Sequence, residues 1–474
     1  LRTVDFRQQI RGPVPVGDSP AIVAVDEASL VAFGRWPWPR ERIAALVSEL
    51  TRLGAAAIGL DIVFAEVEPE GDAMLAEAIR KSGKVVLGYF VDLAGRAESV
   101  HAADLSEYNL IRPGLGESPG EGVLLAAPRV VGNVPVIASA AAGRAGYFNM
   151  LPDGDGIFRR VQLAIRDVSS GEAKRLLVPL PLEILRSVEP NAPLAITFDD
   201  NGVASITLGG RSIPVDRHGD LWVNYAGPPR TFPHYSAADV LGGKIDSAAI
   251  RDRIIIIGVT ATGAYDIRAT PFNPAFPGVE VHANVIENIL HRRALRHPWW
   301  LPAADAGGII LFGLALGAAL QRFKGAWGPL FSVAALAVYL AASQRLFAGS
   351  DIALSAVYPL LLVFLVYPSV TLLHYFTEAR TKRRIRDAFS LYLQPEVARM
   401  VSEDPDLLRL GGEKRDLSVL FSDVRDFTSC AENAEPERLV DFMNEYFGAM
   451  TEIVFANDGL LDKYVGDAIM ALWG

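Results

Sequence analysis

Two short stretches near the end of the sequence place acidic residues at the tips of apolar runs. The first, LSVLFSDVRDFT at 417–428, is an apolar run typical of a buried strand that ends on Asp423. The second, LLDKYVGDAIMALWG at 460–474, carries Gly466 and Asp467 between two β-like runs, which indicates a hairpin. The hairpin would turn Asp467 toward the tip of the first strand. Two carboxylates repel each other unless a cation lies between them, and oxygen ligands suit Mg²⁺ or Mn²⁺. Alternatively, both aspartates are ordinary turn residues.

The composition bounds the class of protein. The chain has 474 residues, half of them hydrophobic, and a net charge of −10, which argues against nucleic acid as a partner. Its single cysteine, Cys430, excludes an intramolecular disulfide and a cysteine zinc site, and is predicted to be buried. The sequence begins with Leu1 and shows no signal peptide, so we expect the native N-terminus, with an export signal or a further helix, to precede it.

The excess of apolar residues is concentrated between 303 and 376. Three stretches, at about 303–320, 326–342 and 352–375, approach the roughly 20 apolar residues of a spanning helix. Three in a row, almost free of charge, favour membrane spans over buried helices of a soluble domain, so we expect contact with lipid in a cell membrane. A transporter is disfavoured, because the spans carry no charged pair that would mark a pathway.

Basic residues near the spans predict their orientation. The largest cluster follows the third span and contains Arg380, Lys382, Arg383, Arg384 and Arg386. Because positive residues favour the cytoplasmic side, residues 377–474 are predicted to be cytoplasmic and residues 1–302 extracytoplasmic. Arg292, Arg293 and Arg296 oppose this orientation, but their cluster is smaller.

The residues before the spans alternate between strand and helix patterns. Apolar runs at 21–26, 55–64, 84–91 and 253–261 predict strands, and amphipathic patterns at 40–54, 71–83 and 278–294 predict helices. Such alternation is typical of an α/β domain with parallel strands.

Acidic residues also stand at the ends of the outer strands. Asp26 and Asp61 each end a strand, and Asp266 lies in a loop rich in Gly and Thr. Ligands of open α/β sheets bind at the carboxyl ends of strands, so these residues could line a ligand crevice. Turns and helix caps are the alternative, and the residue types favour it.

The outer region resembles a CHASE2 domain. The resemblance extends over nearly all of residues 1–300 and includes GYFNMLPDGDGIFRRV at 146–161, WVNYAGPP at 222–229 and PGVEVHANVIENIL at 277–290. CHASE2 domains are extracytoplasmic sensor modules followed by three membrane helices and a cytoplasmic output domain. The resemblance therefore implies that residues 1–302 sense an extracytoplasmic ligand of unknown identity, that 303–376 span the membrane, and that 377–412 form a helical connector. The connector helix would pair across a dimer axis or pack on the output domain.

FSDVRDFT and DKYVGDAIMALWG resemble the two metal motifs of class III nucleotide cyclases. The resemblance implies that residues 413–474 begin an α+β catalytic domain. Asp423, Asp467 and the Val424 carbonyl would hold two Mg²⁺ or Mn²⁺ ions, and the two aspartates would be catalytic. Lys463 stands at the base-selecting position, and a lysine there implies conversion of ATP to cyclic AMP and pyrophosphate.

The resemblance also implies a homodimer, in which one protomer supplies the aspartates and its partner supplies Lys463. The N–H groups of Phe427 and Thr428, at the start of a helix, could cradle phosphates, and Asp426 is predicted to cap that helix. The family's second base-selecting residue and its transition-state Asn and Arg would follow Gly474, so the chain as given is expected to be inactive alone. The alternatives are a receptor scaffold with a catalytically dead tail, and a guanylate or dual-specificity cyclase.

Overall fold

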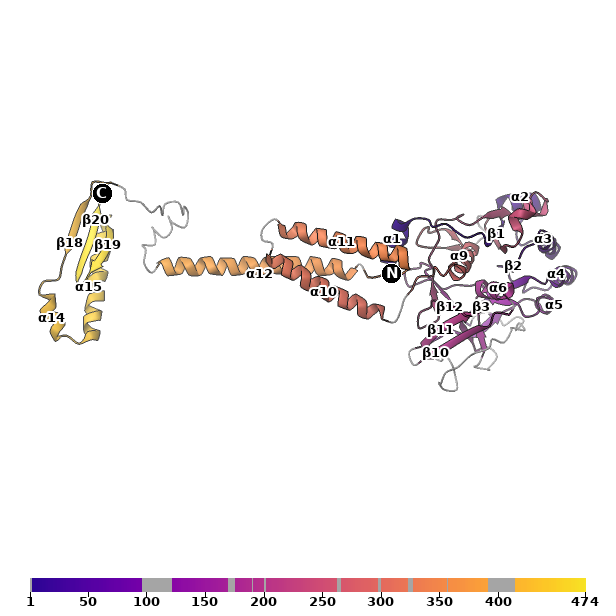
Figure 1. The fold of residues 1–474 in the computed structure, drawn as a ribbon, viewed down its shortest axis with the longest axis horizontal. Helices are drawn as coiled ribbons and strands as arrows, with labels where there is room; N and C mark the ends of the chain where they lie inside the picture. Colours follow the sequence, from indigo (N-terminus) through magenta and orange to yellow (C-terminus); the bar gives the residue numbers. More distant parts are fainter. Residues whose placement is uncertain are drawn as a thin grey trace. The chain divides into compact units, whose positions relative to one another are not determined.

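The computed structural model divides the chain into two units, residues 1–374 and 375–474 (Figure 1). The structure describes residues 2–95, 122–168, 175–189, 191–199, 202–261, 266–296, 300–322, 327–355, 357–390 and 414–474.

A seven-stranded sheet forms the centre of the first unit. Its main path runs in the order β14 (His234–Ser236), β1 (Pro20–Val25), β15 (Ile254–Val259), β2 (Ala57–Leu60), β3 (Val85–Asp92) and β5 (Arg129–Val131), and β6 (Ala145–Tyr147) also pairs with β3. All pairings are parallel except that of β5 with β3, as the alternating sequence pattern predicted. The strand predicted at 55–64 is wrong in its second half. The chain leaves the sheet after Leu60, and the Phe64 N–H donates to the Asn133 side chain at 2.8 Å.

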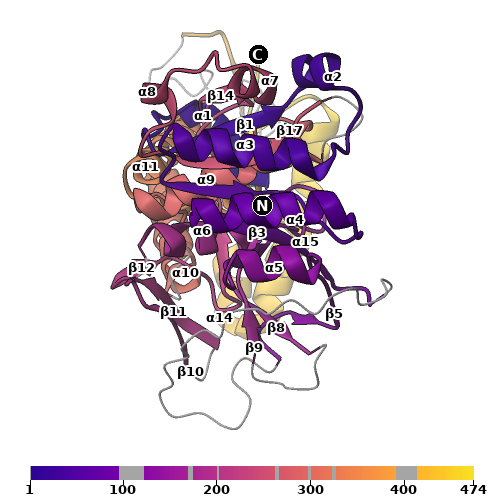
Figure 2. The ribbon, with the colours of Figure 1, turned by 90° about the vertical axis from the view of Figure 1, so that its right-hand side faces the viewer.

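Helices cover both faces of this sheet. One face packs against α3 (Arg40–Arg52), α4 (Pro69–Ser82), α5 (Pro135–Ala140) and α7 (Ala237–Leu241), of which Figure 2 shows α3, α4 and α5 side by side. The other face packs against α6 (Leu180–Val188) and α9 (Gly278–Leu290). On the central strand, Ile255 and Ile257 enter the first core, and Ile254 and Ile256 enter the second. This alternation explains why the strand is apolar throughout.

Smaller elements complete the first unit. They are α2 (Glu27–Phe33), α8 (Ser247–Ile250), β4 (Ala126–Ala127), β7 (Arg160–Gln162), β8 (Ile165–Asp167), β9 (Arg175–Leu177), β10 (Leu194–Asp199), β11 (Gly202–Leu208), β12 (Arg211–Ile213), β13 (Asp220–Trp222), β16 (Ile267–Arg268) and β17 (Phe276–Pro277). The first three strands after α6, β10, β11 and β12, form an antiparallel meander.

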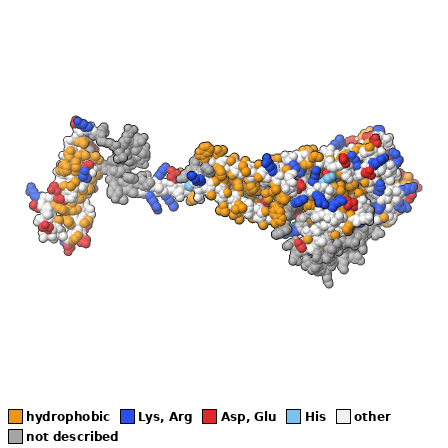
Figure 3. All heavy atoms as spheres, viewed as in Figure 1, with side chains coloured by type: hydrophobic (Ala, Val, Ile, Leu, Met, Phe, Trp, Pro, Cys, Tyr) orange, Lys and Arg blue, Asp and Glu red, His pale blue; other side chains and the backbone are white. Residues whose placement is uncertain are grey.

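Three long apolar helices follow: α10 (Leu301–Arg322), α11 (Trp327–Ser350) and α12 (Val357–Ser390). All three are long and apolar enough to cross a membrane, and Figure 3 shows hydrophobic side chains gathered along them. The predicted bounds need correction. Residues 343–350, predicted as a loop, continue α11, and α12 begins after the predicted start because Ile352 forms a bridge with Arg296. Helix α12 includes the first part of the predicted connector, and the rest of it, 391–412, lies outside the described residues.

The second unit holds a three-stranded antiparallel sheet in the order β18 (Ser418–Ser422), β20 (Ala468–Trp473) and β19 (Leu460–Val465). Helix α14 (Phe427–Asn433) follows the first strand, and α15 (Pro436–Ala456) leads to the hairpin. The rings of Phe447 on α15 and Tyr464 on β19 lie 4.3 Å apart, which fixes the helix against the sheet. The long amphipathic helix and the hairpin agree with the sequence prediction. The predicted strand is also present, but it was predicted to be buried and is exposed within this unit.

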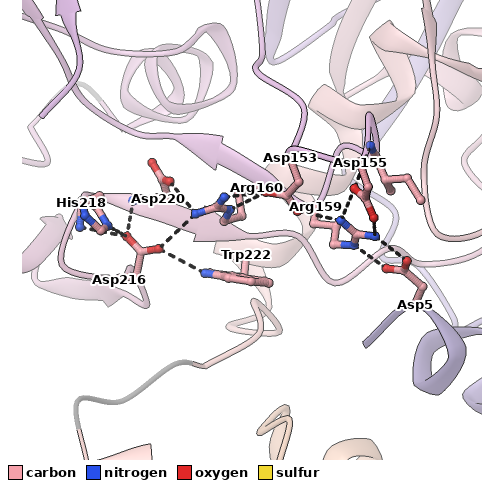
Figure 4. Close-up of polar contacts among 10 residues, drawn as sticks. Asp5, Asp153, Asp155, Arg159, Arg160, Asp216, His218, Asp220 and Trp222 are labelled. Carbon is pink, nitrogen blue, oxygen red and sulfur yellow. Dashed lines mark hydrogen bonds and ion pairs between the residues drawn. The ribbon is translucent and has the colours of Figure 1, made fainter. Parts of the chain in front are cut away.

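In the first unit, a buried arginine joins the N-terminal helix α1 (Arg2–Arg11) to the outer domain (Figure 4). The Arg159 side chain is 1% exposed and donates to both oxygens of Asp5 on α1, at 2.6 and 2.7 Å. It also donates to Asp153 and Asp155 at 2.8 Å. The guanidinium group lowers the pKa of Asp155, because it stabilises the ionised carboxylate. One buried cation thus organises three acidic side chains from two segments.

The same helix contacts the second of the long apolar helices. The guanidinium of Arg7 donates to the backbone oxygen and hydroxyl of Ser343 on α11, at 3.0 and 2.9 Å. The amide of Gln344 donates to the Arg7 carbonyl at 3.0 Å. Helix α1 therefore connects the Arg159 network to α11 through buried polar contacts.

We predict that Arg159→Met destabilises the outer domain by about 3–5 kcal/mol, because it leaves buried carboxylates without a cation. The measurement is unfolding of the detergent-solubilised protein, followed by tryptophan fluorescence. Arg52→Met is the matched control, since exposed Arg52 pairs with its helical neighbour Glu49 on the surface and its loss should leave the transition in place. Equal transitions for parent and Arg159→Met would contradict a clamping role.

Candidate active site and outer cavities

The second unit brings Asp423 and Asp467 together. Ser422 at the end of β18 lies opposite Ile469, so Asp423 follows at the strand tip. Gly466 and Asp467 form the turn of the hairpin, since Val465 pairs with Ala468, and Gly466 takes the positive φ of 67° that this turn requires. The two side chains approach closely enough for their carboxyl groups to share a hydrogen bond.

This proximity has an electrostatic consequence. The pKa of Asp423 is raised above its usual value, chiefly by its hydrogen bond with the Asp467 carboxyl group. Both groups ionise more easily if a cation neutralises them, and carboxylate oxygens are ligands for hard divalent ions. The described residues contain no group of three or more His, Cys, Asp or Glu that could hold a metal. Further ligands would therefore come from backbone or substrate oxygens.

The Val424 carbonyl is the nearest such backbone group in the sequence. It accepts a hydrogen bond from the Phe427 N–H at 3.3 Å, and a carbonyl oxygen keeps a second lone pair that can bind a metal. The donor set, two carboxylates and a carbonyl, therefore fits Mg²⁺ or Mn²⁺. The Phe427 N–H is one of the two backbone groups predicted to bind phosphates, and in this structure it donates to the Val424 carbonyl instead.

Two predictions near this loop are wrong. Asp426 precedes α14 with a left-handed φ of 57°, and its side chain makes no capping hydrogen bond. The Asp426 carbonyl accepts a hydrogen bond from the Cys430 N–H of the helix at 3.2 Å. Cys430 was predicted to be buried but is exposed, because α14 buries none of its residues within this unit.

Lys463 lies on β19 beside an irregularity in the strand pairing. Its ammonium group is 3.3 Å from Asp462, and its side chain is 60% exposed. Among the described residues, no contact of Lys463 with Asp423 or Asp467 is seen. One chain therefore assembles the acidic pair but leaves the lysine apart from it.

The outer domain separates the three acidic residues predicted to line one crevice. Asp26 caps α2: it accepts from the Ser29 N–H at 2.9 Å and from the hydroxyls of Ser29 and Ser236 at 2.6 and 2.7 Å. Burial opposes ionisation of Asp26, but these hydrogen bonds outweigh it and lower the pKa. Asp26 lines a cavity of about 260 Å³, whereas Asp61 and Asp266 line another of about 280 Å³.

Sequence reasoning missed a buried acid on α9. Glu280 is fully buried and accepts from the backbone N–H groups of Arg230 and Thr231, both at 3.0 Å. The His234 ring nitrogen lies 3.8 Å away. Burial raises the pKa of Glu280 to about 7, although these backbone donors oppose the shift. Its signal in the sequence is a row of polar residues at 280, 284 and 288, spaced four apart so that they share one face of the helix.

Comparison with known proteins agrees with this architecture. Residues 1–320 match the CHASE2 domain family. The chain belongs to that family. Residues 412–474 match the adenylate and guanylate cyclase catalytic domain, so a CHASE2 sensor domain is joined here to a class III nucleotide cyclase domain.

Curated relatives match a short part of this CHASE2 protein. Adenylate cyclase 1 of Rhizobium meliloti (strain 1021) is 33% identical over 93 residues, which cover 19% of this chain and 14% of the relative. An adenylate cyclase of Anabaena cylindrica is 42% identical over 59 residues, which cover 12% of each chain. The chain thus spans only a small fraction of the length of either relative.

We predict a pH-dependent difference between the parent protein and Glu280→Gln. The raised pKa means that the folded state holds the Glu280 proton more tightly than the unfolded state. Its contribution to stability is therefore complete below about pH 4.5 and is lost as pH rises through about 7, by about 3 kcal/mol in total.

Unfolding of both proteins between pH 4.5 and 8 would measure this difference, and Glu280→Gln should gain stability relative to the parent as pH rises. Exposed Glu77→Gln is the control. A difference that stays constant across this range would rule out the raised pKa.

Proposed function

We propose that this protein is a membrane-bound adenylate cyclase that converts ATP to 3′,5′-cyclic AMP and pyrophosphate under control of its CHASE2 domain. The observation that carries the proposal is the Asp423–Asp467 pair, held at adjoining strand tips within a cyclase domain. The two curated relatives reported above are both named as adenylate cyclases, which supports the proposal.

Asp423, Asp467 and the Val424 carbonyl would hold two Mg²⁺ or Mn²⁺ ions. Such ions, when bound, supply the charge neutralisation and Lewis acidity that in-line phosphoryl transfer requires. The protein's part is to fix the oxygen ligands on a rigid sheet. Phe427 and Thr428, at the start of α14, would face the phosphates, and the Phe427 N–H would exchange its Val424 partner for a phosphate oxygen.

Lys463 would select the base. Its ammonium group is a donor only, so it suits an acceptor nitrogen of adenine and not a protonated ring nitrogen of guanine. Because Lys463 and the acidic pair are not in contact within one chain, we propose that Lys463 completes the site of a partner protomer. The homodimer would then be the active form.

The orientation follows from the basic residues around the spans. Residues 1–302 would lie outside the cell and 377–474 in the cytoplasm, since the largest Lys and Arg cluster follows the third span. Helix α12 runs without a break from Val357 to Ser390, so it would carry a signal from the membrane toward the cyclase domain.

We predict that Asp423→Ala lowers cyclic AMP formation from Mn-ATP roughly a hundredfold or more, because phosphoryl transfer loses its charge stabilisation. The assay uses native membranes that contain the full-length protein. Asp426→Asn is the matched control: it removes a charge three residues away whose side chain caps nothing, and Asn tolerates the left-handed backbone. If Asp423→Ala and the parent form cyclic AMP equally well, Asp423 does not bind a catalytic metal ion. If neither forms cyclic AMP, the result favours a receptor scaffold.

We predict that Lys463→Glu shifts nucleotide preference. Loss of a charged hydrogen bond to adenine should lower the rate with ATP about tenfold to a hundredfold, while a carboxylate can accept from guanine. The measurement is the ratio of cyclic AMP to cyclic GMP with both nucleotides present. Lys414→Glu, which makes the same charge change outside the hairpin, is the control. An unchanged ratio would show that Lys463 does not read the base.

A further inference from the structure

The outer domain holds a cavity of about 280 Å³ at the carboxyl ends of β2 and β15. Asp61 and Ile62 directly follow β2, and Val259 is the last residue of β15. Val279, at the start of α9, also lines the cavity. The Asp61 N–H donates to the Ile257 carbonyl at 2.9 Å, so the base of the wall belongs to the rigid sheet. This edge is where α/β sheets bind their ligands.

We propose that this cavity binds an organic ammonium ion, a protonated amine carried on an aromatic body, and that this ion is the class of ligand sensed by the CHASE2 domain. The second part rests on the proposed sensory function.

The charge of the cavity wall favours a cation. Among the described residues, the recorded side-chain contact of Asp61 is with the His282 ring nitrogen at 3.6 Å, beyond hydrogen-bond distance. Its carboxylate is therefore available to a donor. Asp266, the other acid in the wall, forms an ion pair with Arg268. Burial raises the pKa of Asp266; Arg268 opposes this shift and the nearby Asp61 adds to it.

Arg40, the arginine in the cavity wall, does not make the net charge of the wall positive. Arg40 lies 3.4 Å from Asp72 and 3.8 Å from Glu68, so two acids already compensate it. Acidic groups therefore outnumber arginines in and behind the wall, and an anion would be repelled. A bare divalent ion is also a poor fit, since the described residues offer no cluster of three acidic or metal-binding side chains.

Aromatic rings supply the rest of the wall: Trp36, Trp38, Phe64 and Phe148. Aromatic faces attract cations, and Arg40 already lies over the Phe64 ring with 4.8 Å to its centre. Gly88 on β3 allows Phe148 to approach the sheet, because a Cβ there would lie 2.7 Å from the Phe148 ring. In this proposal the Trp36 and Phe148 rings contact the apolar part of the amine, and the Asp61 carboxylate pairs with its ammonium group.

His282 connects the cavity to the membrane side of the domain. It is buried on α9, behind Asp61, and its second ring nitrogen has no hydrogen-bond partner among the described residues. The same helix binds the backbone at 224–231 through Asn288, Asn284 and Glu280. A cation that draws Asp61 away from His282 would therefore act on α9, a helix that ends shortly before the first membrane span.

The test is isothermal titration of the full-length, detergent-solubilised protein with phenethylammonium. The matched probes are 2-phenylethanol and phenylacetate, which carry the same ring with no charge and with a negative charge. We expect saturable binding of the ammonium ion only. Equal binding of the alcohol, or no saturable binding of the ammonium ion, would overturn the proposal.

Asp61→Asn should weaken phenethylammonium binding at least tenfold, whereas Asp239→Asn should not, because exposed Asp239 on α7 pairs with Lys244 away from the cavity. If Asp61→Asn does not fold, Asp266→Asn should weaken binding by leaving Arg268 unneutralised beside the cavity. Unchanged binding in the folded variant would overturn the proposal. Asp423→Ala should bind the ammonium ion normally, so failure of this inference and failure of the cyclase proposal give different results.

Discussion

Burial of both faces of the parallel sheet is the constraint on which the outer domain depends. Ile254 to Ile257 must serve two cores at once, so the central strands carry no polar side chains. Polar side chains are therefore found at the strand ends, where the backbone leaves the sheet. Asp26 and Asp61 occupy such positions, but their environments differ. Three hydrogen bonds from Ser29 and Ser236 satisfy the first, whereas the second faces a cavity.

The cyclase unit also places its acidic residues at strand ends, although its antiparallel sheet is largely exposed within the unit. The pairing of β18 with β20 fixes which residues reach the tip, and the hairpin turn fixes the second carboxylate beside the first. The raised pKa of Asp423 is the cost of this arrangement in the absence of a neutralising charge. Such a pair would suit a divalent cation, which supports the metal-binding role that we propose for these two aspartates.

Local patterns predicted the elements but not their long-range partners. The apolar run at 253–261, the helix at 40–54 and the hairpin at Gly466 follow from periodicity and turn chemistry, and all three are present. The early end of β2 could not be predicted, because the competing acceptor, Asn133, is remote in the sequence. The Arg159–Asp5 pair and the burial of Glu280 were missed for the same reason. Of the three acidic residues considered for one crevice, Asp61 and Asp266 share a cavity, whereas Asp26 caps a helix, as the alternative predicted. A strand end specifies an edge of the sheet, not a position along it.

Buried polar contacts decide how the outer domain can transmit a change. Arg159 holds Asp5, Arg7 of the same short helix holds Ser343 on α11, and each bond lies where water cannot replace it. Breaking one of them would leave a buried charge unpaired, at a cost of several kcal/mol. The contacts should therefore persist when the domain responds, and α1 should move with the outer domain as one body. This network therefore favours a signal in which the domain moves as a rigid body and displaces the membrane helices. Local unfolding where α1 meets α11 would cost more free energy.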